Sequence, residues 1–248
     1  MDVLSLAGIV LGIAAILLGN MLDGGLNSAL LNGSAAIVVF GGTFAAVMVQ
    51  TPLVVMLSAF KRCFWFVFPP KFHLDDLLTK LCKWAHVARQ EGLIGLEGMV
   101  KNAEPLAQKG LSLLADGQPP SAIRASLELD LYRQEDKGLQ GAHVYESLGG
   151  YAPTIGIMGA ILGLMQVLSN LSSPDDMGPG IASAFVATLY GVGSANLIFL
   201  PLAERLKFLV RKEYIYNELM IEGLVAISEG EHPKSIRYRY ESLKKAGQ

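Results

Sequence analysis

Hydroxyl and amide side chains are the groups that could do chemistry in the most apolar part of this sequence. Between residues 149 and 203 they include Thr154, Gln166, Ser183, Thr188, Tyr190 and Asn196. Oxygen atoms of this kind can help to replace the hydration shell of a hard cation. A lone Thr in an apolar helix more often bonds the helix backbone, and we expect this bonding for most of the six.

Charged side chains are missing from every stretch long enough to span a bilayer. Asp23, Asp175 and Asp176 lie in turns between such stretches, and Glu146 and Glu204 lie at their ends. Intramembrane ionisable residues are the usual carriers in proton relays and coupled transport. An ordinary secondary transporter is expected to contain either an intramembrane ionisable residue or a substrate site formed by broken helices. If this chain moves protons, the carboxylate must therefore arrive on another chain.

The remaining reactive side chains fit no catalytic or metal-binding motif. His73, His86 and His143 have no nucleophile or metal spacing around them, and Cys63 and Cys82 match no redox motif. We expect solvated histidines and reduced cytoplasmic thiols. The sequence thus predicts no enzyme activity, no metal site and no cofactor.

The positions of the basic residues indicate how the chain is oriented. All 20 Lys and Arg residues lie in two blocks, Lys61–Lys137 and Arg205–Lys245. Cytoplasmic loops accumulate Lys and Arg whereas translocated loops do not, so both blocks are expected in the cytoplasm. The first block holds 11 bases and also ten carboxylates, and the whole chain has a net charge of −2. Such a mixed-sign surface indicates no nucleic-acid partner.

The two stretches between the basic blocks predict membrane spans. The chain is 52% hydrophobic and 17% charged, whereas soluble domains are about 25% charged. A span needs about 20 residues, and each stretch has room for two. The expected spans are Val3–Met21, Ser34–Leu57, Tyr151–Leu171 and Ile181–Ala203. The first is interpreted as a retained span, because no basic region precedes it and no small-residue cleavage site follows it.

The fold predicted is all-α: an integral membrane protein with four transmembrane helices and a helical cytoplasmic insertion between the second and third. Within the insertion, apolar spacing predicts helices at Leu74–Ala88, at Met99–Leu114 and from Ser121 to Tyr145. The fourth helix is expected to continue to about Ile227, and the charged tail after Pro233 to be mobile.

This reading divides the chain into four parts. They are residues 1–57 (the first two transmembrane helices), 58–148 (the cytoplasmic helical domain), 149–203 (the third and fourth transmembrane helices) and 204–248 (the cytoplasmic extension and tail). Both termini are expected in the cytoplasm.

Small residues recur at helical spacing in the last two spans. Gly156, Gly159 and Gly163 lie in one, and Ala187 and Gly191 in the other. Residues of this size let membrane helices approach closely. They indicate either helix packing within the chain or an interface with another subunit, and the sequence leaves both open.

A family resemblance follows from the same hairpin. The run GGYAPTIGIMGAILGL from Gly149 to Leu164 resembles the third span of flagellar stator subunits of the MotA/PomA family. The match continues over Gly180–Ala182, Ala184–Gly193, Ala195–Pro201 and the tail motif Glu229–Pro233. It covers essentially the whole chain, whose length is like that of the shorter MotC and PomA members.

The resemblance implies a bacterial inner-membrane motor subunit. It implies a ring of subunits, five in number, around the single spans of two MotB/PomB-type partners, each with an intramembrane Asp and a peptidoglycan-binding domain. Ions crossing at the interface with the partner would drive rotation, and the cytoplasmic insertion would push the rotor protein FliG. Lipid would surround the ring, and the output would be torque for motility and chemotaxis.

The resemblance also assigns residues to an ion path and to the transmission of force. Ala160, Thr188 and Tyr190 match ion-path positions. Sodium-driven relatives tend to carry Thr where this chain has Ala160, so the expected ion is H⁺ rather than Na⁺. Pro153 and Pro201 match prolines at the inner ends of the third and fourth spans, where a missing donor kinks a helix.

Arg89 and Glu97 match the rotor-facing charged pair of the family. The runner-up is an ExbB/TolQ-type proton-driven energiser of outer-membrane processes. Those proteins have a single span before their insertion, whereas two spans are expected here, and the placing of Arg89 and Glu97 also favours the flagellar interpretation.

Overall fold

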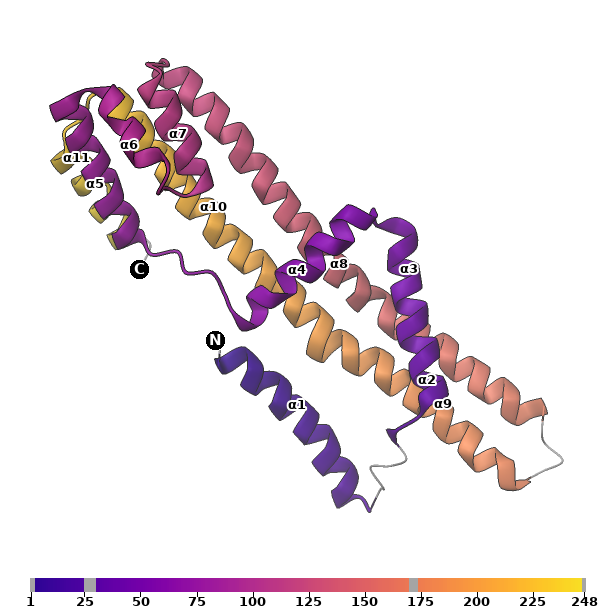
Figure 1. Cartoon of the computed structure of the whole chain (residues 1–248). Helices are drawn as coiled ribbons and strands as arrows, with labels where there is room; N and C mark the ends of the chain where they lie inside the picture. Colours follow the sequence, from indigo (N-terminus) through magenta and orange to yellow (C-terminus); the bar gives the residue numbers. More distant parts are fainter. Residues whose placement is uncertain (1–2, 25–29, 170–173, 247–248) are drawn as a thin grey trace. The chain divides into compact units, whose positions relative to one another are not determined.

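The computed structural model describes residues 3–24, 30–169 and 174–246. In these residues the chain is helical apart from short connections and contains no strand (Figure 1). It forms two compact units. The membrane unit comprises Met1–Pro69 and Lys137–Leu209, and the helical-domain unit comprises Pro70–Asp136 and Val210–Gln248.

The membrane unit begins with α1, Val3–Leu22, which confirms the helix expected there. A turn follows in which Gly24 adopts a φ of +75°, a conformation that residues with a Cβ rarely take. The next helical stretch consists of α2 (Gly33–Ala36), the π-helical segment η2 (Ile37–Gly41) and α3 (Gly42–Gln50). Asn32 caps it, because its side chain accepts a hydrogen bond from the Ala35 amide at 3.0 Å.

The continuous helix expected over Ser34–Leu57 is wrong. Helix α3 ends at Gln50, Thr51 is extended with φ −112° and ψ 125°, and α4 (Leu53–Val67) begins after Pro52. The ring of a proline disfavours helical torsions in the residue before it, so the chain turns at Thr51. Helix α4 then packs against α8, where the Tyr145 hydroxyl donates to the Ala59 carbonyl at 3.2 Å.

Helix α8 is a single helix of 50 residues, Pro120–Ser169. The expected separation between a cytoplasmic helix ending near Tyr145 and a span starting at Tyr151 is therefore absent, since neither Gly149-Gly150 nor Pro153 breaks the helix. The helix expected from Ser121 starts one residue earlier, at Pro120. Part of the turn expected around Asp175 and Asp176 lies outside the described residues, and α9 starts at Pro174.

A continuous helical stretch, longer than a bilayer is thick, contains the fourth expected span, Ile181–Ala203. It comprises α9 (Pro174–Ser194), the π-helical segment η4 (Ala195–Phe199) and α10 (Leu200–Ser228). The expected extension to about Ile227 is confirmed. Gly230, with a φ of +75°, follows the end of α10.

Three stretches among the described residues are long and apolar enough to cross a membrane. They lie within Gly33–Gln50, Pro120–Ser169 and Met177–Ser228, and Ala7–Leu22 is a shorter apolar helix. The number of spans beyond these three stays a prediction.

The helical-domain unit combines α5 (Leu74–Glu91), η3 (Leu93–Leu96), α6 (Glu97–Val100), α7 (Pro105–Ala115) and α11 (Pro233–Ala246) with the ends of α8 and α10. The helix predicted at Leu74–Ala88 is confirmed. The single helix expected over Met99–Leu114 is wrong, because the chain leaves the helical path after Val100 and restarts at Pro105, a residue suited to a first turn.

The tail after Pro233 is not a free segment but helix α11, which lies beside α5 in Figure 1. Its Ile236 and Tyr240 are buried in a core formed with α5, α7, α8 and α10. The Cys82 thiol also lies 3.7 Å from the Pro233 carbonyl oxygen. The high charge of the tail made its amphipathic pattern hard to recognise in the sequence. The expectation of a mobile tail is wrong.

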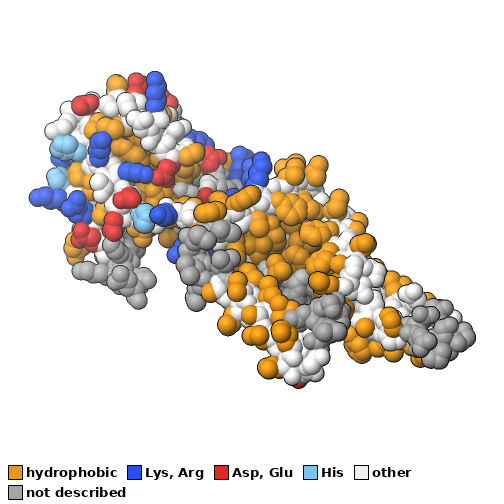
Figure 2. All heavy atoms as spheres, turned by 60° about the horizontal axis from the view of Figure 1, so that its bottom comes forward, with side chains coloured by type: hydrophobic (Ala, Val, Ile, Leu, Met, Phe, Trp, Pro, Cys, Tyr) orange, Lys and Arg blue, Asp and Glu red, His pale blue; other side chains and the backbone are white. Residues whose placement is uncertain are grey.

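The two units differ in their surfaces, as the face in Figure 2 shows. Charged side chains gather on the helical-domain unit, whereas hydrophobic side chains cover the membrane unit. Large apolar residues stay exposed on α1, α3, α4, α8 and α9. A surface of this kind is suited to hydrocarbon or to another subunit rather than to water.

Candidate functional site

The hairpin of α8 and α9 is held together by direct backbone contact. A Cβ placed on Gly156 would lie 3.0 Å from the Ala187 carbonyl oxygen and 3.2 Å from the Gly191 Cα. A Cβ on Gly191 would in turn collide with the carbonyl group of Ala152. Only glycine fits where the two backbones are this close.

The same close contact, called the seam below, continues along both helices, towards the C-terminal end of α8 and the N-terminal end of α9. Gly159 faces the Ala187 methyl group at 2.9 Å, and Gly163 faces Ala184 at 3.1 Å, both measured from an added Cβ. Ala184 and Ala187 are buried. The four glycines that the sequence singled out therefore pack helices within the chain. The alternative of an interface with another subunit stays a prediction.

Ala160 and Thr188 lie directly beside this seam and are both half-buried. The Thr188 hydroxyl donates to the Ala184 carbonyl at 3.4 Å, which is a long hydrogen bond. The expectation that hydroxyls and amides bond the helix backbone is also met by Thr154 and Asn196, which donate to Tyr151 and Val192. The Thr188 hydroxyl is therefore only weakly hydrogen-bonded in an apolar region.

Tyr190 lies at the end of the hairpin where the second helical stretch begins. Its hydroxyl donates to the Leu30 carbonyl at 2.5 Å and accepts from the Asn32 amide at 3.1 Å. Its ring stacks on Phe40 with 6.0 Å between centroids. This tyrosine therefore fastens residues 30–40 to α9.

An uncharged polar cavity of about 450 Å³ lies at the same end of the membrane unit. Asn32, Ser34, Gln166 and Ser183 supply its amides and hydroxyls. Sequence reasoning recognised Gln166 and Ser183 but missed Asn32 and Ser34. The Asn-Gly-Ser run could have revealed them, because it is a typical helix start.

The two prolines occupy different kinds of position. Pro153 lies inside α8, where it cannot donate a helical hydrogen bond. Pro201 is the second residue of α10 and lies two positions after the end of the π-helical segment η4, in which the backbone pairing shifts by one residue. Both helices are therefore weakened locally at these points.

One side of the hairpin has no partner within the described chain. Ile157, Met158, Ile161, Leu162 and Met165 of α8 are each more than half exposed. Phe185 of α9 is exposed as well. The hairpin thus has an exposed apolar face along α8, the helix that carries Ala160. No other part of the described chain covers this face, which is called the unfilled face below, and it carries no ionisable side chain.

Arg89 and Glu97 lie on either side of a tight turn in the helical-domain unit. Helix α5 ends at Glu91, Gly92 adopts a φ of +77°, and Glu97 opens α6. Both charged side chains are exposed, and neither pairs with an oppositely charged group in the part of the chain that the structure describes. The turn at Gly92 and the 3-10 helix η3 thus separate two exposed charges of opposite sign.

Within the described ranges, no three His, Cys, Asp or Glu side chains gather as a metal site. Cys63 and Cys82 are free thiols. Among the histidines, His143 contacts Glu146 with its Nδ1 3.1 Å from Oε2, and Glu146 in turn accepts from the Lys207 ammonium.

The chain resembles known membrane proteins over most of its length. Residues 100–218 match the MotA/TolQ/ExbB proton channel family. The chain is 35% identical over 242 residues to Motility protein A of Bacillus subtilis, covering 96% of this chain and 89% of the relative.

Solved structures show the same fold. The structure of MotAB from C. jejuni superposes with a TM-score of 0.90 at 26% identity, over 97% of this chain and 94% of that chain. The flagellar MotAB stator complex from Bacillus subtilis gives a TM-score of 0.84 at 34% identity, over 94% and 92% of the two chains.

Proposed function

Because this chain belongs to the MotA/TolQ/ExbB proton channel family and is a flagellar stator subunit, we propose that it conducts protons together with a MotB-type partner and turns their flow into torque on the rotor. It is a channel subunit and not an enzyme. It is a multi-pass protein of the inner membrane.

The observation that carries this proposal is the α8–α9 hairpin. Its seam is closed by glycines, its neighbouring face is apolar and unfilled, and no charged side chain lies along it. A proton does not cross hydrocarbon without a titratable carrier. The relatives of solved structure are MotAB complexes. A partner span that brings an Asp to this face supplies the carrier that the chain lacks.

The ion that fits this face best is H⁺. Ala160 offers no oxygen to a dehydrating Na⁺, whereas a sodium path needs several such ligands. Thr188 retains a weakly held hydroxyl close to the seam and is the relay group of the proposal. Tyr190 anchors the outer end of the path through Leu30 and Asn32. No cofactor takes part.

The topology proposed has four membrane helices, in residues 1–57 and 149–203, with both termini in the cytoplasm. The two Lys and Arg blocks support this orientation. Residues 58–148 and 204–248 then form the cytoplasmic part. Five copies around two partner spans are proposed from the family resemblance, with lipid against the exposed apolar side chains of the ring.

Force reaches the rotor through the helical-domain unit in this proposal. Arg89 and Glu97, exposed at the Gly92 turn, contact charged groups of FliG. Charge pairs at the rim of an interface determine steering and register more than affinity, which suits a repeated transient contact. Pro153 and Pro201, where α8 and α10 are locally weakened, couple titration of the partner's Asp to movement of the cytoplasmic helices.

The alternative is an energiser of the ExbB/TolQ type. Several relatives at 30% identity or more over at least 95% of the chain carry motility names, such as Motility protein A. The proposal therefore stays with the flagellar motor.

Motility of a bacterium that lacks its own stator genes tests this function. We expect swimming when this chain is expressed together with a MotB-type partner, in medium without sodium, and loss of swimming when the proton gradient is collapsed. The control is the same partner with its intramembrane Asp changed to Asn. Swimming that requires sodium would contradict the assignment of H⁺.

A further inference from the structure

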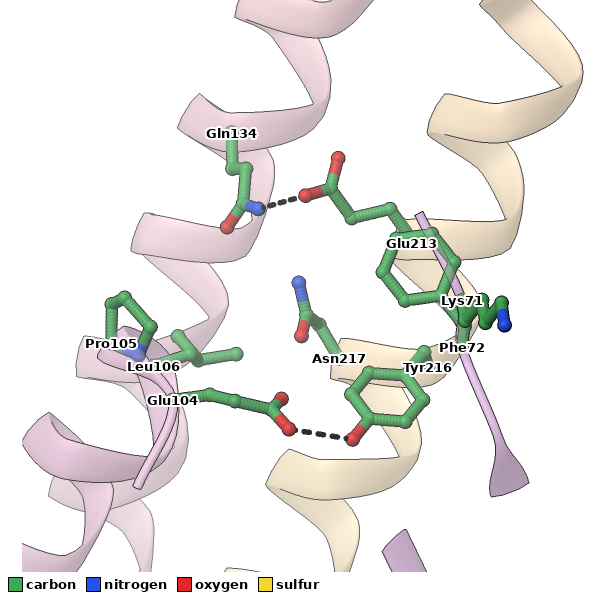
Figure 3. Close-up of a pocket in the computed structure, with 9 residues that line it drawn as sticks. All are labelled: Lys71, Phe72, Glu104, Pro105, Leu106, Gln134, Glu213, Tyr216 and Asn217. Atoms are coloured by element: carbon green, nitrogen blue, oxygen red, sulfur yellow. Dashed lines mark hydrogen bonds between the residues drawn. The ribbon is translucent and has the colours of Figure 1, made fainter. Parts of the chain in front are cut away.

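A polar cavity in the helical-domain unit has no part in the proposed ion path. Its volume is about 240 Å³, and residues from four segments line it. Glu104 precedes α7, Gln134 lies on α8, Glu213, Tyr216 and Asn217 lie on α10, and Phe72 precedes α5 (Figure 3). All of these residues belong to the same compact unit.

Asn217 is the polar group that this cavity leaves unsatisfied. The residue is only 7% exposed, and its carboxamide makes no hydrogen bond to any other described residue. Figure 3 shows its side chain between the Gln134–Glu213 pair and the Glu104–Tyr216 pair. Its carboxamide faces the cavity and is open to hydrogen bonding there. This position is therefore explained best by a group that enters the cavity and bonds Asn217.

The neighbours of Asn217 make the cavity rich in acceptors. The Gln134 amide donates to Glu213 Oε1 at 2.7 Å, and the Tyr216 hydroxyl donates to Glu104 Oε1 at 3.0 Å. Burial, followed by the charge of Glu104, raises the pKa of Tyr216, so the phenol stays a donor to the carboxylate. Two carboxylates and one amide oxygen thus line a space that is suited to hydrogen-bond donors.

Two aromatic rings and two lysines complete the surroundings. The rings of Phe72 and Tyr216 lie with centroids 5.5 Å apart at 45°. Lys80 pairs with Glu104 at 2.5 Å. Lys71 also lines the cavity, but its ammonium points away from Asn217 in Figure 3. An anion here would face two carboxylates, whereas a cation finds acceptors and ring faces, both of which attract it.

We propose that this cavity binds a small organic cation with several N–H donors, an alkylguanidinium or alkylammonium, through Asn217, Glu213 and Glu104. The donors of such a group match the acceptors of the cavity. Its volume admits a small amine but not a folded partner. The ligand would join the segments before α5 and α7 to α8 and α10, and thus stabilise the helical-domain unit independently of ion flow.

Calorimetric titration of the purified full chain in detergent tests the site, with agmatine as the probe. Agmatine carries a guanidinium and an ammonium group. We expect saturable binding with a dissociation constant below about 1 mM. Tetramethylammonium, which has the charge but no N–H donor, is expected to bind at least about tenfold more weakly, because charge-assisted hydrogen bonds are lost. Inorganic phosphate should not bind.

Two variants and one control connect the binding to these residues. Asn217→Ala and the isosteric Glu213→Gln should each weaken agmatine binding at least about tenfold. Glu218→Gln removes the same charge from an exposed position on the same helix and should leave binding unchanged. Agmatine should also raise the midpoint of thermal unfolding of the unmodified chain, and this rise should be lost in Glu213→Gln.

The contrary results are equally clear. Absence of saturable agmatine binding would overturn the proposal, and so would equal affinities for the unmodified chain and Glu213→Gln. Equal affinity for tetramethylammonium would overturn the role of N–H donors. If Asn217→Ala does not fold, Glu213→Gln decides the question alone.

Discussion

The side chains along the proposed ion path carry hydroxyl groups but no charge. Thr188 bonds the Ala184 carbonyl at 3.4 Å, and Ala160 beside the seam offers only a methyl group. Sequence alone indicated this shortage of charge and its consequence, a carboxylate on another chain. It could not indicate Asn217, because the cavity that this residue faces is formed by segments far apart in the chain.

The exposed pair at the Gly92 turn gives a prediction for torque. Arg89→Glu together with Glu97→Lys should abolish or strongly reduce swimming, since the charges that face the rotor are reversed. Neither residue pairs with another described group, so the amount of protein in the membrane, measured by immunoblot, should stay the same. Reversal of the exposed Lys83 and Asp76 on α5 is the matched control. Unchanged swimming speed of the Arg89/Glu97 double variant would remove the pair from the mechanism.

The ion pair of Arg124 and Glu222 predicts how the helical-domain unit responds to acid. Two hydrogen bonds of 2.5 and 3.0 Å join the guanidinium to the carboxylate. The hydrogen bond from Arg124 lowers the pKa of Glu222. A carboxylate with a lowered folded-state pKa stabilises the fold above its unfolded-state pKa of about 4.3, and this contribution is lost as the pH falls through the folded-state value.

Glu222→Gln should therefore lower the midpoint of thermal unfolding at pH 7 by about 2–4 °C, as expected for about 1 kcal/mol. The difference from the unmodified chain should shrink between about pH 5 and pH 3. Glu218→Gln, with an exposed carboxylate on the same helix, should show no such pH-dependent difference. A difference that stays constant down to pH 3 would contradict the assigned pKa shift.

Helices could be predicted from the sequence where apolar spacing was the main determinant. The helices at Val3–Leu22 and Leu74–Glu91, and the continuation of α10 to Ser228, agree with that pattern. The pattern failed where local backbone chemistry prevails, as at Thr51 before Pro52. It also failed for α11, whose charged composition hid two residues, Ile236 and Tyr240, that are buried in the core of the helical-domain unit.

The glycine seam between α8 and α9 predicts a contrast between two neighbouring positions. Gly191→Ala should destabilise the hairpin by about 1–3 kcal/mol, because the new methyl group collides with the Ala152 carbonyl and presses on Gly156. Gly193→Ala is the control, since a Cβ there has open space. Thermal unfolding in detergent, followed by circular dichroism, measures both. Equal midpoints for the two variants would show that the seam does not hold the helices together.

Pro153 gives a second prediction about an element. Pro153→Ala restores the missing backbone donor inside α8, so the helix should become stiffer and at least as stable. If the local weakness transmits the movement, rotation should slow or stop while the protein accumulates normally in the membrane. Tethered-cell rotation at the normal rate would exclude this role for the proline.

The whole chain is an incomplete channel. Its membrane unit closes one seam with glycines and leaves a neighbouring apolar face unfilled, and its helical-domain unit carries the exposed charges that the rotor would meet. The absence of intramembrane charge, read from the sequence, and the unfilled face, read from the structure, both indicate the same missing part. The central claim is that protons cross only when a partner's Asp occupies that face.

Proton entry into cells tests this claim most directly. The chain is expressed alone, with a MotB-type partner whose plug segment is deleted, and with the same partner carrying Asn in place of its intramembrane Asp, while a pH-sensitive fluorescent protein reports cytoplasmic pH. The account predicts acidification only with the Asp-bearing partner, and no dependence on sodium. Acidification by the chain alone, or with the Asn-bearing partner, would contradict it.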